Sequence, residues 1–384
     1  ARLPEQFPQT PVEKAPGTVA GIDPDFKLPQ VWKNTLAADF KLPLPFNAEM
    51  TLEGIYAKNL NAVIQQNVNV IPLSDPKMKR FAGPDNRYLY PGATESRIYK
   101  DMSGAYILTN TTRGYSYNLN ASLRMNPVEN LNVLLSYTYT DSKEVSGNPG
   151  AQPNELWQNV PTVNGGNYMQ LTNSQYLTPH KVIASLSYRI PYAKNFATSV
   201  SLFYSGYNAG NFSYMYDGDM NQDGINNDLI YIPKSKDELT FVDKNGFTAA
   251  QQAEAFWNYV NQDSYLKNHK GEYAKAYSAR YPWVNQVDLK VVQDFIVKAG
   301  KTTNTLQVSL DIFNIGNLLK DTWGISKVPV NSGRILKYEG LTADNVPTYS
   351  MYQSDGKLPT ETFSYLKNSS DCWQIQVGIR YIFN

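Results

Sequence analysis

The sequence predicts an all-β fold, an antiparallel transmembrane β-barrel of which about nine strands and several long outer loops are present. Three observations predict it. Apolar and polar residues alternate with a period of two, a pattern that suits strands and that a helix would spread around its whole surface. Short and long connections alternate along the chain. No apolar run reaches the roughly 18 residues of a membrane-spanning helix.

The composition agrees with strands that have one lipid-facing and one polar face. The chain has 28 Tyr, 15 Phe and 6 Trp, yet it is hydrophilic overall. Its 35 basic and 34 acidic residues nearly cancel, so charge draws it neither to nucleic acid nor to an anionic surface. The single cysteine, Cys372, excludes an internal disulfide framework.

The alternation defines the strands individually. In 182–190 the even-numbered residues are apolar or aromatic, in 115–125 the odd-numbered ones are, and in 373–383 the odd-numbered ones are again. Each strand reaches or exceeds the about 9–11 residues that a tilted strand needs to cross a bilayer. We predict nine strands, at 33–43, 47–58, 113–126, 131–141, 181–191, 196–207, 284–297, 304–315 and 372–383.

The connections give the orientation, because outer-membrane barrels have short periplasmic turns and long extracellular loops. The long loops are expected at about 59–112, 142–180, 208–283 and 316–371. Residues 1–32 are then the remnant of an extracellular loop, and 33–384 are the C-terminal part of the barrel. Bacterial barrels have an even number of strands. We therefore expect that nine strands do not close alone and that an N-terminal portion is missing.

Two structured segments are expected within the loops. Thr248 is placed to cap a helix that runs to about Val260. Residues 333–341 and 347–352 are expected to form a small hairpin beyond the membrane.

A run of oxygen-bearing residues in the third long loop matches part of a calcium-binding loop. Calcium prefers 6–8 oxygen ligands, and a turn glycine at position six lets them converge. The alternative is an ion-free surface turn, since Asn, Asp and Gly favour turns in any case and Ile230 stands where an EF-hand has its bidentate glutamate. The predicted ligands are side-chain oxygens of Asp219, Asn221, Asp223 and Asp228 and the carbonyl of Ile225.

Other local patterns predict binding and not catalysis. Aromatic residues at strand ends are expected in girdles at the membrane interfaces. The loop residues Trp157, Tyr214 and Tyr216 are the candidates for ligand contact. Neither His180 nor His269 has a second ligand at zinc spacing, and no GxSxG, P-loop or dinucleotide motif is present. The sequence predicts no enzyme activity and no cofactor apart from the calcium ion.

Several segments resemble the C-terminal half of TonB-dependent outer-membrane receptors of the Oar-like type. The most specific are Asp219–Pro233, Asn261–Gly271 and Tyr281–Lys290, while Leu310–Leu318 and Val377–Phe383 resemble the last two strands of such barrels. The resemblance implies a barrel of about 22 strands, an N-terminal plug and a TonB-contacting segment. It also implies energy-coupled import of bulky nutrients across the outer membrane of a Gram-negative bacterium. The plug, the TonB-contacting segment and the other strands would belong to the missing portion or to a partner chain.

Three functions therefore compete. The leading hypothesis is TonB-dependent transport, in which the strands contact the lipid bilayer and the loops around 157, 214–233 and 248–280 capture the ligand. The second is an outer-membrane interaction or assembly barrel whose loops bind a surface protein. The third is a passive porin. An upstream plug favours the first, a co-purifying surface protein the second, and an open conducting lumen the third.

Overall fold

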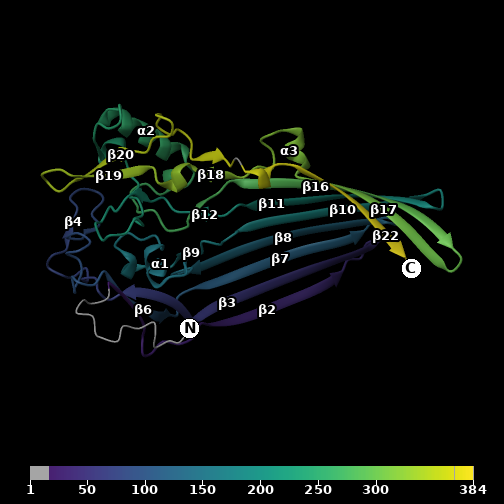
Figure 1. Ribbon diagram of the computed structural model, residues 1–384, viewed down its shortest axis with the longest axis horizontal. Helices are drawn as coiled ribbons and strands as arrows, with labels where there is room; N and C mark the ends of the chain where they lie inside the picture. The colour runs from purple at the N-terminus through teal and green to yellow at the C-terminus, as the bar shows by residue number, and fades with distance from the viewer. Residues whose placement is uncertain (1–16, 367, 384) are drawn as a thin grey trace, which may run out of the picture.

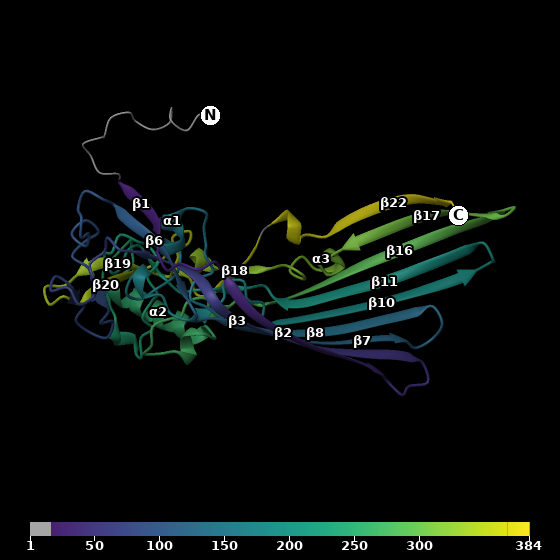
Figure 2. The ribbon, with the colours of Figure 1, turned by 90° about the horizontal axis from the view of Figure 1, so that it is seen from below.

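The computed structural model describes residues 17–366 and 368–383. Nine long strands form one curved antiparallel sheet, with turns at one end and loops at the other (Figures 1 and 2). In order across the sheet they are β2 (Gln30–Lys41), β3 (Asn47–Asn67), β7 (Tyr115–Asn126), β8 (Leu131–Glu144), β10 (His180–Tyr192), β11 (Phe196–Asn208), β16 (Trp283–Ala299), β17 (Thr302–Phe313) and β22 (Gln374–Phe383).

These strands confirm the nine that the alternation predicts, with ends that differ by a few residues at most positions. The tight turns between β2 and β3, β7 and β8, β10 and β11, and β16 and β17 gather at one end of the sheet (Figure 1). The turn after β16 needs only two residues and places Gly300 at a φ of 64°, where glycine avoids steric strain. The outer edges of β2 and β22 have no strand partner among the described residues.

One face of the sheet is apolar and the other is polar. Successive residues of a strand point to opposite faces, and the register places residues of the same kind opposite one another on neighbouring strands. One row is wholly apolar: Leu186, Leu202, Leu289, Ile312 and Ile375 lie opposite one another on five neighbouring strands. The adjacent row, on the other face, is polar: Ser187, Ser201, Lys290, Asp311 and Gln376.

Side-chain contacts on each face match its polarity, with an ion pair on the polar face and aromatic contacts on the apolar one. Lys290 Nζ lies 2.6 Å from Asp311 Oδ1, so these two charges on the polar face are paired. On the apolar face aromatic rings meet across strands near both ends of the sheet. Tyr56 stacks on Tyr117 at 5.8 Å near the loops, and Phe196 meets Phe295 at 5.7 Å near the turns. Aromatic belts of this kind mark the two interfaces of a membrane.

The first long loop is more regular than the sequence predicts. Strand β3 continues to Asn67, and β6 (Gly104–Thr111) pairs with this extension in the register that β7 uses below it. The strand β1 (Thr18–Ile22) then pairs with β6 in parallel. The alternating pattern misses these pairs because it reports contact with lipid, and above the membrane a strand needs no apolar face. Residues 1–16 of the predicted loop remnant 1–32 lie outside the described residues.

Both structured loop segments are confirmed. Helix α2 (Ala249–Gln262) begins after Thr248, whose side chain accepts from the backbone N–H of Gln251 while Gln251 bonds back to the backbone of Thr248. Strands β19 (Leu336–Leu341) and β20 (Pro347–Met351) form the hairpin. None of the helices in the described ranges is long and apolar enough to cross a membrane.

The remaining elements are short and lie in the loops. The helices are α1 (Pro153–Gln158) and α3 (Ile315–Leu319). The strands are β4 (Lys79–Arg80), β5 (Tyr88–Leu89), β9 (Thr172–Asn173), β12 (Asn211–Phe212), β13 (Tyr216–Asp217), β14 (Thr240–Phe241), β15 (Ala279–Arg280), β18 (Lys327–Pro329) and β21 (Phe363–Tyr365).

An arginine substituted midway along β10 tests which face of the sheet contacts lipid. Leu186→Arg places a charge among the apolar rows and is expected to lower the free energy of unfolding by about 2–4 kcal/mol. Ser187→Arg is the matched control, because Ser187 lies on the polar face with its Oγ 2.8 Å from that of Ser201, and it is expected to cost far less. Denaturant titration of the full-length protein in bilayers measures both. Equal costs would mean that the faces are assigned wrongly.

Candidate functional site: the loop assembly

The long loops fold together into one packed body at the end of the sheet opposite the turns (Figure 1). We call the described residues of the ranges 59–112, 142–180, 208–283 and 316–371 the loop assembly. Its main apolar core draws Phe81 from the first loop, Phe256 from the third and Leu336 from the fourth. A second cluster joins Tyr106, Trp157 and Ile225, from three different loops. The loops therefore form a folded domain-like surface with an interior of its own.

A buried arginine joins the first loop to the third. The guanidinium of Arg87 donates to both carboxylate oxygens of Asp85, at 2.9 and 3.0 Å, and to Asp228 Oδ1 at 3.3 Å. A further bond reaches the carbonyl of Leu229 at 2.7 Å. The hydroxyl of Tyr216 donates to Asp85 at 2.9 Å. All three charged side chains are buried, so each depends on the others for its stability.

The structure brings the predicted calcium ligands together in one turn. Asp219 accepts from the backbone N–H groups of Asp223 at 3.2 Å and Gly224 at 2.8 Å. The carboxylate of Asp223 accepts from the backbone of Ile225 at 2.9 Å. Asp228 Oδ2 accepts from the backbone of Met220 and Asn221, at 2.8 and 3.3 Å. These side chains thus hold the turn by bonding to its own backbone.

Burial raises the pKa values of two of these carboxyl groups. Desolvation, together with the charges of Asp228 and Asp219, raises the pKa of Asp223 well above its usual range. Desolvation also raises the pKa of Asp228 to about 7, although Arg87 opposes the rise. Across residues 17–366 and 368–383 no three or more His, Cys, Asp or Glu side chains are grouped to hold a metal ion. Calcium binding by the turn stays a prediction.

The three aromatic candidates for ligand contact all lie in the interior. Trp157 donates from Nε1 to Asn167 Oδ1 at 2.7 Å and packs on the ring of Tyr106. The hydroxyl of Tyr214 donates to Asp263 Oδ2 at 2.8 Å. Tyr216 stacks on Tyr349 with ring centroids 5.5 Å apart. Because all three rings are buried, they contribute to the framework and present no surface to a ligand in this conformation.

A hollow of about 270 Å³ lies between the second and third loops, and sequence reasoning did not identify it. Its wall includes the rings of Tyr168 and Tyr273 and polar groups of Asn164 and Glu272. Thr162 also lines it and is almost fully buried, and its hydroxyl has no hydrogen-bond partner among the described residues. A hollow lined by both aromatic and polar residues suits a small polar ligand. No local motif marks these residues, because segments distant in the sequence form the hollow.

Together these features define a membrane-embedded β-sheet wall that supports a folded outer surface. The chain belongs to the family of outer membrane β-barrel domains, which it matches over residues 2–320. It is therefore an outer-membrane protein whose strands contact the lipid bilayer, as predicted, and proteins of this family are typically not enzymes. No curated protein and no solved structure shows significant similarity to the chain.

Removal of Arg87 tests its role in joining the loops. Arg87→Ala leaves Asp85 and Asp228 buried without their cation, and we expect a cost of about 3–5 kcal/mol and faster protease cleavage within 208–283. Lys100→Ala is the matched control, since both side chains of its pair with Glu95 are more than half exposed and exposed ion pairs contribute little to stability. Limited proteolysis of the full-length protein compares the two. Similar cleavage rates for both variants would contradict a stabilising role for Arg87.

The raised pKa of Asp228 predicts how loop stability depends on pH. The folded carboxyl holds its proton more tightly than the unfolded one, so in EDTA the protection of 208–283 should fall as pH rises from about 3.8 to about 7. Hydrogen exchange, corrected for its intrinsic pH dependence, measures this. Asp228→Asn should weaken the pH dependence, because it removes one of two titrating carboxyl groups and leaves Asp223 as the other, and an unchanged profile would argue against Asp228.

Calcium has the opposite requirement, since it binds the deprotonated carboxylates. If the turn holds calcium, adding the ion at pH 8 restores the protection that EDTA removes, and chelation increases proteolysis within 208–283. Equal protection with calcium and with EDTA would count against the ion.

Proposed function

We propose that the chain forms part of the wall and the outer capture surface of a TonB-dependent transporter. Membership of the outer membrane β-barrel family supports the location and the wall. The step to energy-coupled import rests on the resemblance of residues 219–233, 261–271 and 281–290 to Oar-like receptors. The loop assembly supports it further, because a capture site needs loops held in a defined arrangement.

The observation that carries the proposal is the position of the resembling segment 219–233. Ile230 and Ile232 in this segment are buried in the main core of the loop assembly, and Leu229 lines the hollow between the second and third loops. The segment thus connects the main core of the loop assembly to one side of the hollow. We assign the hollow to one small polar group of a larger ligand, seated between Tyr168 and Tyr273.

The same proposal assigns the remaining partners. A plug and further barrel strands would be supplied by residues outside this sequence or by a partner chain. The TonB system would act through the plug, on the periplasmic side where the tight turns lie. A calcium ion in the 219–228 turn would stabilise the scaffold without taking part in transport.

The decisive experiment uses the full-length protein purified from outer membranes. For a TonB-dependent transporter we expect a closed channel in planar bilayers and direct binding of the periplasmic domain of TonB. Steady open-channel conductance without TonB binding would contradict the proposal and indicate a porin. A closed channel that does not bind TonB but co-purifies with a surface protein would also contradict it, and would indicate an interaction barrel.

A further inference from the structure

The wall has a local gap near the loop end of β16. Residues 283–288 of β16 pair with β11, but β17 joins β16 only from Leu289 onward. Beyond Phe313 the chain turns away at Asn314, which has a φ of 49°, and enters the short helix α3. Within the described residues, the upper edge of β16 therefore has no neighbouring strand.

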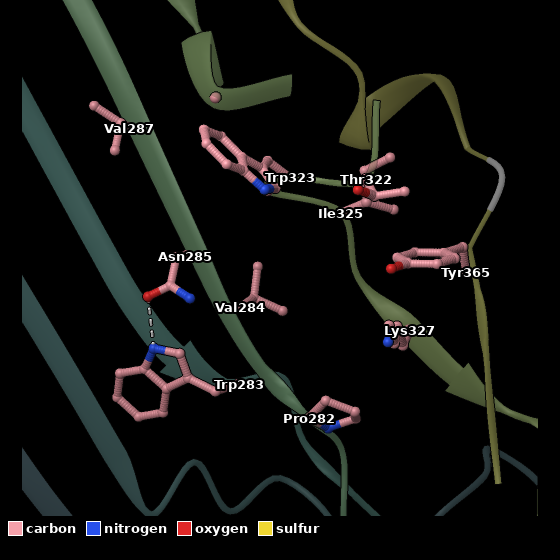
Figure 3. Close-up of a pocket in the computed structure, with 12 residues that line it drawn as sticks. Pro282, Trp283, Val284, Asn285, Val287, Thr322, Trp323, Ile325, Lys327 and Tyr365 are labelled. Carbon is pink, nitrogen blue, oxygen red and sulfur yellow. Dashed lines mark hydrogen bonds between the residues drawn. The ribbon is translucent and has the colours of Figure 1, made fainter. Parts of the chain in front are cut away.

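A hollow of about 420 Å³ lies in this gap (Figure 3). Trp283 and Val284 from β16 border it on one side, and Trp323 and Tyr365 from the fourth loop border it on the other. The rings stay accessible: Trp283 is 38%, Trp323 53% and Tyr365 44% exposed. A second hollow of about 470 Å³ adjoins the first, since Thr322, Ile325 and Tyr365 line both.

The position of Trp283 places the hollow at the membrane interface. Trp283 lies on the same face of β16 as the lipid-facing Leu289, six residues along the strand. Its indole N–H and the hydroxyl of Tyr204 both donate to Asn285 Oδ1, at 2.9 and 2.7 Å. Indole and phenol groups with one polar contact and one apolar face are typical of the interfacial belt. The hollow thus opens where acyl chains meet head groups.

Two lysines supply positive charge in or beside the hollow. Lys327 lines it with its Nζ 4.6 Å from the ring centroid of Tyr365. Lys320 does not line it, but its Nζ lies 5.9 Å from the ring centroid of Trp323, which does. Neither ammonium is within ion-pair distance of a carboxylate in the described part of the chain. The nearby Asp371 carboxylate accepts from the backbone N–H of Ser326, and Asp321 lines only the second hollow.

We propose that this hollow is a binding site for one anionic lipid of the outer membrane. An acyl chain lies against Trp283 and Trp323, which continues the apolar face of the wall into the gap. The anionic head group meets Lys320 and Lys327. The lipid covers apolar rings that would otherwise face water, and it occupies the position of the absent strand neighbour. This site is separate from the ligand hollow between the second and third loops.

The test compares two lipids with the same acyl chains. The full-length protein, delipidated in detergent, is titrated with palmitoyl-oleoyl phosphatidylglycerol or phosphatidylcholine and studied by native mass spectrometry. We expect one tightly held phosphatidylglycerol and weaker binding of phosphatidylcholine. Lys327→Gln and Lys320→Gln are each expected to weaken phosphatidylglycerol binding about fivefold. The matched control is Lys270→Gln, because Lys270 also lies over a tryptophan ring, that of Trp257, but in the third loop.

A second measurement locates the lipid without relying on charge. Phosphatidylglycerol with brominated acyl chains should quench tryptophan fluorescence, and Trp323→Phe should remove part of that quenching, while circular dichroism confirms the fold. Equal affinity for the two lipids, an equal effect of Lys270→Gln, or quenching unchanged by Trp323→Phe would each overturn the proposal. So would a dimer or another protein whose binding excludes the lipid.

Discussion

Backbone hydrogen bonding in hydrocarbon is the constraint on which the rest of this structure depends. Inside a bilayer an unpaired N–H or C=O group has no water to bond, so strands must be paired along the length that crosses the membrane. From β3 to β17 each strand has a neighbour on both sides. The pairing fixes the register, and the register fixes which side chains face lipid. Among the nine long strands, only β2 and β22 leave a whole edge open within the described residues, and such edges call for further strands in a bilayer.

Above the membrane a different balance applies. Water can satisfy the backbone there, so the loops are free to leave the sheet, and burial of aromatic and aliphatic side chains holds them together instead. Because this core contains many tyrosines, its hydroxyl groups need partners. The carboxylate of Asp85 accepts hydrogen bonds from the hydroxyls of Tyr216 and Tyr273, and that of Asp263 accepts one from Tyr214. Asp85 is buried, so it in turn needs Arg87 as its counter-charge. The charged groups of the loop assembly therefore depend on how its side chains pack.

The sequence predicts the wall well because each strand is a local pattern. Alternation identifies Val182 to Ile190 without any knowledge of β11, and the Thr248–Gln251 capping box is contained within four residues. The loop assembly is less accessible, because its contacts join distant segments. Tyr216 and Trp157 look like surface aromatics in the sequence, and only the packing of several loops buries them. The hollow beside Thr162 depends on residues about 110 positions away, a distance that no sequence window of a strand or helix covers.

The junction between wall and loops is where both constraints weaken, and β16 illustrates the consequence. At Asn314 the strand ladder ends, and side-chain bonds replace it. The Asn314 backbone N–H donates to Asp288 Oδ1 at 2.8 Å, and its side chain donates to the carbonyls of Gly324 and Asp371, at 3.1 and 2.7 Å. Such bonds hold α3 near the sheet without filling the space beside β16. An irregular backbone of this kind is tolerated at the interface because water reaches it, while lipid reaches the same place from below. Exposed aromatic rings and lysines therefore remain at the junction between the long strands and the loops, where one lipid molecule can contact both hydrocarbon and water.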